Sequence, residues 1–222
     1  FDNVTLNGDL YEISNLNTLE IDNLLFPVTL DFNLKNVFFT DLDPEFSMYL
    51  NMLGYEDLAF DLSFQSSIDY KTQKFRIILD TLIYDAFGIE TELLFSNLDI
   101  NSLNLTNDNE MLDYFTNEFK FELFQIEIID NGLTDKLFIF LEDFYGIKKN
   151  DIKKLLLEEI NNDADLRSTI DTKNIKKILN FIENPRNIKF IINPLNPISY
   201  NDILIYSMNP ALLIDELNVS LE

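Results

Sequence analysis

Apolar and polar side chains alternate along residues 58–100, and this alternation predicts three long strands in succession. Period-two alternation places one set of side chains on each face of a pleated sheet. We therefore expect a central antiparallel meander with one apolar face and one polar face. The alternating apolar positions of its first strand are Leu58, Phe60, Leu62, Phe64, Ile68 and Tyr70.

The middle strand of this meander is different, because residues 77–84 are apolar at both alternating sets of positions. Such a strand is expected to be covered on both sides. The turn before it is expected at Lys71–Lys74 and the turn after it at Phe87-Gly88.

Alternation also predicts strands before the meander, with a turn at Asn15–Asn17 and a second strand from Leu24 to Leu34. Pro27 lies within that second strand. A proline has no amide hydrogen to donate to a neighbouring strand, so Pro27 is expected at a sheet edge or at a bulge.

Helical periodicity appears between and after these strands. Asp43-Pro44-Glu45 predicts a capped helix start, and Gly54 predicts its end. Ser199 and Asp202 have the spacing of a capping box for a short helix that ends near Met208. The other expected helices occupy residues 107–118, 133–145, 152–160 and 175–182, with strands at 119–129, 188–192 and 217–221.

These elements predict an α+β fold in a single domain over residues 1–222. Residues 1–105 are mainly strands and residues 106–222 mix helices with strands. No linker rich in Gly, Ser or Pro separates the two parts. We expect a large, twisted antiparallel β-sheet of roughly six to ten strands, with helices from the C-terminal half packed on its apolar face.

The composition narrows the classes of function. The 222 residues carry 39 acidic and 16 basic side chains, a formal net charge of −23. Such a chain is expected to repel a phosphate backbone and anionic lipid headgroups, so nucleic acid is excluded as a partner. Cys, His and Trp are absent. This removes thiol nucleophiles, disulfides, imidazole metal ligands and the usual catalytic base at neutral pH.

Acidic groups that resemble metal sites have simpler interpretations. Asp41, Asp43 and Glu45 surround a proline at a helix start, which is typical of a cap. The segment from Asn161 has the odd-position acids of an EF-hand loop, but Leu166 replaces the glycine at its sixth position. We interpret it as an exposed loop between helices. The sequence therefore predicts no metal site, no cofactor and no enzyme activity.

The 20 Phe residues have two interpretations. They can form an ordinary core, or they can line a groove for an acyl chain if helices cover the sheet only in part. The candidate apolar-ligand residues on the meander are Phe60, Phe64, Phe75, Tyr84, Phe87 and Phe95.

Three stretches resemble a group of uncharacterised, exported, β-rich bacterial cell-envelope proteins. They are Leu53-Gly-Tyr-Glu-Asp-Leu58, Asp130-Asn-Gly-Leu-Thr-Asp135 and Asn193-Pro-Leu-Asn-Pro197. The resemblance implies a periplasmic or otherwise exported location, and it implies no activity or site residues. No apolar run long enough to span a bilayer occurs, and any signal peptide or anchor would precede Phe1.

Two functions follow as hypotheses. The first is a non-enzymatic binding or structural module of the cell envelope, which joins a protein partner in a larger assembly through an edge strand. The alternative is a carrier or sensor of an apolar ligand such as a lipid.

Overall fold

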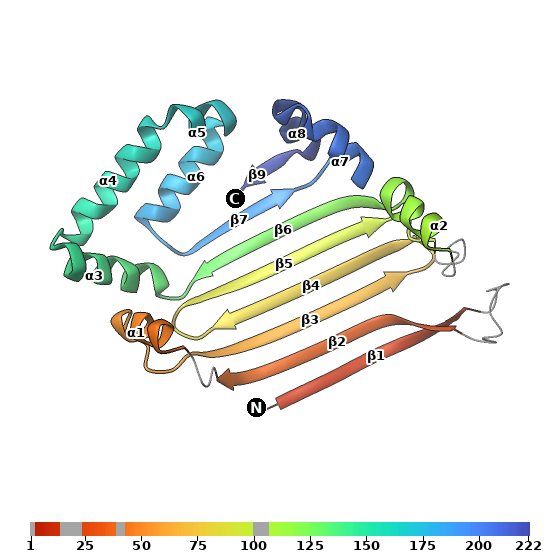
Figure 1. Cartoon of the computed structure of the whole chain (residues 1–222), viewed down its shortest axis with the longest axis horizontal. Helices are drawn as coiled ribbons and strands as arrows, with labels where there is room; N and C mark the ends of the chain where they lie inside the picture. The colour runs from red at the N-terminus through yellow and green to blue at the C-terminus, as the bar shows by residue number, and fades with distance from the viewer. Residues whose placement is uncertain (1–2, 14–23, 39–42, 100–106) are drawn as a thin grey trace.

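One antiparallel sheet forms the scaffold of the chain. The computed structural model describes residues 3–13, 24–38, 43–99 and 107–222, and nine strands join a single sheet. Strands from both ends of the chain enter it, in the order β1-β2-β3-β4-β5-β6-β7-β9, and β8 pairs with β6 (Figure 1). The predicted α+β class is confirmed. The strands are β1 Asn3–Ile13, β2 Leu24–Phe38, β3 Ala59–Asp69, β4 Lys74–Ile83, β5 Phe87–Ser96, β6 Lys120–Asp130, β7 Asn187–Ile192, β8 Ile198–Ser199 and β9 Val219–Leu221.

Helices occupy the connections between strands. A one-turn π-helix, η1, continues α2 directly. The helical elements are α1 Pro44–Met52, α2 Asp108–Asp113, η1 Tyr114–Glu118, α3 Leu133–Tyr145, α4 Lys149–Asn162, α5 Ala164–Thr169, α6 Thr172–Glu183, α7 Tyr200–Ser207 and α8 Pro210–Leu217.

Several boundaries of these elements lie where the sequence predicted them, and local hydrogen bonds or backbone geometry account for each. The Asp43 carboxylate accepts a hydrogen bond from the amide of Glu45 at the start of α1, and Gly54 follows that helix with φ of +80°. The capping box of Ser199 and Asp202 starts α7, with hydrogen bonds in both directions. Pro27 lies at the point where the β1–β2 register shifts, so it occupies a bulge.

Other local predictions are wrong. The turn after β4 lies at residues 84–86, and Phe87 and Gly88 begin β5 instead. Asp85, within this turn, has a positive φ of 55°. The segment after Asn161 is not a loop, because it contains the short helix α5. The turn expected at Asn15–Asn17 lies outside the described residues.

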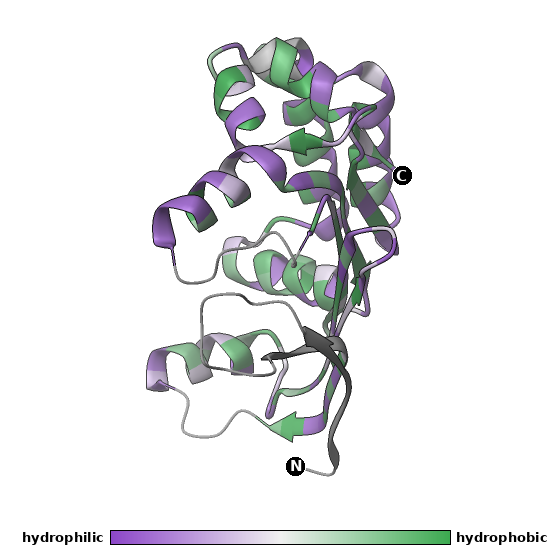
Figure 2. Ribbon diagram, turned by 90° about the vertical axis from the view of Figure 1, so that its right-hand side faces the viewer, coloured by the Kyte–Doolittle hydropathy of each residue, from purple (hydrophilic) through white to green (hydrophobic). Residues whose placement is uncertain are grey.

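The helices form a rim around the sheet. Looking onto the sheet, Figure 1 shows α1 and α3 at one end of the strands and α2 at the other. The helices α4–α8 lie beyond β6, near β7 and β9, and no helix overlies the middle of β2–β5 in this view. Figure 2, turned by 90°, shows that the helices project mainly to one side of the sheet.

Two clusters of buried residues lie at the two ends of the meander strands, and Phe138, Ile175 and Ile198 are buried outside them. At the α1 end, Tyr55, Leu58 and Ala86 are buried and pack against Ile83, Phe87 and residues of α1 and α3. At the α2 end, Leu98 is buried against Ile68, Phe75, Tyr114 and Phe119. Among the described residues, no large side chain is fully buried. Among the described residues, therefore, no packed layer of side chains covers the middle of the sheet.

Candidate apolar binding face

The strand register places the apolar residues of the sheet on one face. Phe64 of β3 pairs with Leu79 of β4, Leu79 with Thr91 of β5, and Thr91 with Ile126 of β6. Directly paired residues point to the same side. The row continues to Phe32 of β2 on one side and to Phe190 of β7 on the other. It thus crosses the middle of the sheet with Thr91 as its only polar member.

Parallel rows of the same character lie on each side of this one. We call the whole set the apolar face. It consists of Leu30, Phe32, Leu34, Val37, Phe60, Leu62, Phe64, Ser66, Ile68, Phe75, Ile77, Leu79, Thr81, Ile83, Phe87, Ile89, Thr91, Leu93, Phe95, Phe121, Phe124, Ile126, Ile128, Ile188, Phe190, Ile192, Val219 and Leu221.

No member of the apolar face is buried. Leu79 is 38% exposed and Ile128 39% exposed, although both lie in central strands. On the opposite side of β4, Leu82 is 37% exposed. The expectation that residues 77–84 are covered on both sides is therefore wrong. The doubly apolar pattern identifies a strand with apolar side chains on both faces, and it contains no information on what covers them.

Many apolar side chains on one face of the sheet therefore keep part of their surface exposed. Soluble monomers rarely expose one continuous apolar patch larger than a few hundred Å², and larger patches often mark a binding surface.

The predicted ligand residues, Tyr84 excepted, share the apolar face. Phe60 and Phe87 both pair with Ile83 at the α1 end, and Phe64 lies in the middle row. Tyr84 follows β4 and lies apart from them, because its hydroxyl donates a hydrogen bond to the Asp61 carboxylate, 2.8 Å away.

Phe75 and Phe95 form part of an aromatic cluster at the α2 end of the strands. Their ring centroids are 6.1 Å apart, and Phe95 stacks on Phe119 at 4.8 Å. Phe121 meets Phe95 edge to face, and Phe115 meets Phe119 in the same way. These contacts bind the short helical segment α2–η1 to the sheet, so Phe75 and Phe95 have a structural role as well.

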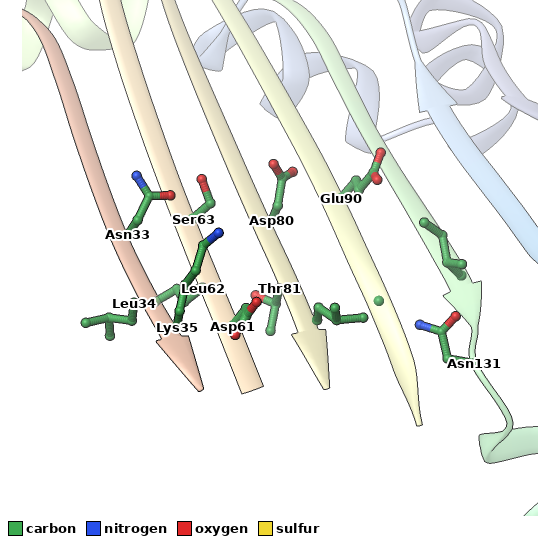
Figure 3. Close-up of a pocket in the computed structure, with 13 residues that line it drawn as sticks. Asn33, Leu34, Lys35, Asp61, Leu62, Ser63, Asp80, Thr81, Glu90 and Asn131 are labelled. Atoms are coloured by element: carbon green, nitrogen blue, oxygen red, sulfur yellow. The ribbon is translucent and has the colours of Figure 1, made fainter. Parts of the chain in front are cut away.

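The opposite face of the sheet is polar and acidic. Ser63, Asp80 and Glu90 pair across β3, β4 and β5, and Glu127 of β6 follows Glu90. Figure 3 shows Ser63, Asp80 and Glu90 pointing to the same side of their neighbouring strands, within a shallow hollow of about 340 Å³. Basic partners lie nearby: Arg76 pairs with Glu92 at 2.6 Å, and Lys189 with Glu127 at 3.9 Å. Among the described residues, no group of acidic side chains is arranged to hold a metal ion.

The acidic row gives a pH-dependent prediction at Asp80. Burial raises the pKa of this carboxyl above its ordinary value of 3.8. When the pKa of a group is higher in the folded state than in the unfolded state, the protonated group stabilises the fold fully at a pH below the unfolded-state pKa. This stabilisation is lost as the pH rises through the folded-state pKa. Asp80→Asn removes the loss of stability that follows from ionising the buried carboxyl. It also removes a negative charge that lies directly opposite Glu90. We expect it to raise the free energy of unfolding at pH 7 by about 0.2–1 kcal/mol.

The measurement is urea unfolding of the wild type and Asp80→Asn at a series of pH values. The gain should disappear near and below the ordinary carboxyl pKa, where Asp80 is protonated in both states. A gain that is the same at low and neutral pH would contradict this explanation.

Comparison with known protein families finds a match over much of the chain. A family model described as "Uncharacterized protein" matches residues 81–222, well over half of the chain. The chain belongs to this family. Its origin is bacterial, and the matched segment begins within β4 and includes every later element. No curated protein and no solved structure matches the chain.

Sequence reasoning recognised the aromatic residues of the meander and missed their partners. Phe32, Leu79, Ile126 and Phe190 join the same row only through the register of five strands. Each of these residues lies in an alternating or apolar segment, so its face could be assigned locally. The order of the strands, which brings the segments side by side, was the missing information.

Proposed function

We propose that this chain is a non-enzymatic carrier or sensor of an apolar ligand such as a lipid, and that the apolar face holds the ligand. The observation that carries the proposal is the partly exposed row Phe32–Phe64–Leu79–Ile126–Phe190 across the middle of the sheet. Covering apolar surface is worth about 25 cal/mol per Å². An occupant that covers even part of this face therefore gains substantial binding energy.

The rim of helices favours a slender occupant over a flat protein surface. Helices lie at both ends of the strands, and they project mainly to one side of the sheet (Figures 1 and 2). At those two ends, residues of α1, α3 and η1 pack against the same buried side chains as residues of the apolar face do. An acyl chain is narrow enough to lie between them on the sheet, whereas a second rigid sheet would meet the helices first.

A protein partner is the second candidate, through an edge of the sheet. Among the described strands, β1 pairs only with β2 and has eleven residues, so it offers an edge to which another strand can add. The opposite edge is partly occupied, because the amide of Leu221 in β9 donates a hydrogen bond to the Asn174 side chain of α6. Assembly at β1 and ligand binding on the apolar face are compatible with each other.

The proposal includes an exported, periplasmic location in the bacterial cell envelope. It is supported by the resemblance of three sequence stretches to exported envelope proteins and by a surface suited to apolar molecules that membranes supply. Among the described helices, none is long and apolar enough to cross a membrane. We exclude catalysis from the proposal because the chain contains neither His nor Cys.

Native mass spectrometry of the chain purified from bacterial cells without detergent tests this function. We expect a second population heavier than the bare chain by the mass of a lipid. Organic extraction should release that mass and leave a single unliganded species. A preparation that carries no additional mass, and that gains none when mixed with phosphatidylcholine vesicles, would contradict the proposal.

A further inference from the structure

An apolar cavity adjoins the apolar face at the α1 end of the strands. Its volume is about 330 Å³, and its accessible lining contains no polar surface. Phe46 and Leu50 line it from α1, Leu53 lines it just after that helix, and Leu133 lines it from the first turn of α3. Ile83 and Phe87 of the apolar face also line it, so the cavity continues from the surface proposed to hold the ligand.

The walls of this cavity are fixed on one side. The Tyr55 hydroxyl donates a hydrogen bond to the backbone carbonyl of Asp85 at 2.9 Å, and the Lys136 ammonium lies 3.5 Å from the centre of the Tyr55 ring. The amide of Leu133 bonds to the carbonyl of Ala86, which joins α3 to the same turn. Phe46, in contrast, is 49% exposed. The cavity is therefore rigid near Tyr55 and borders on solvent near Phe46.

The lining selects the chemistry of the occupant. An entirely apolar cavity gives no hydrogen-bond partner, so a peptide backbone entering it would leave its amide and carbonyl groups unpaired, at a cost. Dry apolar cavities instead accept hydrocarbon. The volume lies at the lower end of the range for ligand pockets, enough for part of a chain rather than a whole lipid.

The charge of the protein selects the headgroup. With a net charge of −23, the chain repels anionic headgroups, and a zwitterionic headgroup avoids this repulsion. We propose that the cavity beneath α1 receives the terminal end of the acyl chain of a zwitterionic phospholipid whose remaining length lies on the apolar face. This inference rests on the proposed function. It adds that affinity increases with the length of the acyl chain only until the chain end fills the cavity, and we call that length the length limit.

Calorimetric titration with lysophosphatidylcholines of increasing chain length, kept below their micelle concentrations, tests the inference. Wild-type affinity should rise about fourfold for each added methylene until the chain end fills the cavity, and then stop rising. Phe46→Ala should enlarge the cavity and move this limit to longer chains. Leu50→Phe should fill it and move the limit to shorter chains.

Met48→Ala is the matched control, because Met48 is on the same helix, is 50% exposed and does not line the cavity. Its length limit should equal that of the wild type. Binding with the same limit in all four proteins would overturn the inference and leave the proposed function intact. No binding of any chain length to the wild type would overturn both. Circular dichroism melts establish which variants are folded, and Phe46→Ala and Leu50→Phe each test the inference independently.

Discussion

Tyr55→Ala is expected to lower the free energy of unfolding by about 3–5 kcal/mol, the usual cost of deleting a buried aromatic side chain. Tyr55 is 5% exposed and lies in the buried cluster that joins α1, the turn after β4 and the start of α3. Folded domains are stable by only about 5–15 kcal/mol, so the loss is a large share of the total. Urea unfolding followed by circular dichroism measures it.

Tyr55→Phe separates the ring from its hydroxyl. This variant keeps the packing and loses only the hydrogen bond to the Asp85 carbonyl, so we expect a cost of about 0.5–1.5 kcal/mol. Equal costs for the two variants would mean that the ring contributes little, which contradicts the assignment of Tyr55 to the core. A loss of less than about 1 kcal/mol for Tyr55→Ala would contradict it too.

The sequence predicts elements well where local chemistry determines them. Asp43-Pro44 and the Ser199–Asp202 pair each give a cap whose hydrogen bonds form within a few residues, so no distant contact is needed to place them. Pro27 is a similar case, since its missing amide hydrogen restricts it to a bulge wherever its strand lies. Period-two alternation likewise assigned Phe60 and Phe64 to one face.

Local signals fail where two residues compete for a position or where a helix is short. Asp85 adopts the positive φ in the turn after β4, although Gly88 is the residue that more often does so. α5 spans six residues and α8 eight, too few for a clear helical period. A short helix of this kind depends on its caps and its packing more than on its own sequence.

The exposure of the apolar face could not be predicted from the sequence. Alternation shows that Leu79 and Ile77 share a side of β4, and the same alternation is expected for a strand beneath a complete helical layer. The helices after residue 133 carry apolar side chains, yet α6 packs on β7 and β9, α7 on β8 and η1, and α4 on α3 and α6 (Figure 1). What covers a face depends on the loops that position the helices, and loops have weak sequence signals.

Leu79→Lys is expected to weaken binding of an acyl ligand by about tenfold or more, because it replaces a leucine contact in the middle row with a charge that must stay hydrated. Since Leu79 is already 38% exposed, the substitution should change the unfolding free energy little. Leu82→Lys is the matched control. Leu82 lies three residues later on the same strand, is 37% exposed and points to the opposite face.

The measurement that tests the central claim most directly is the affinity of these two variants and the wild type for one lysophosphatidylcholine, obtained by calorimetry under identical conditions. If the apolar face holds the ligand, Leu79→Lys loses about tenfold or more in affinity, and Leu82→Lys stays within about twofold of the wild type. If both variants bind as the wild type does, or if Leu82→Lys is the weaker of the two, the apolar face is not the binding surface.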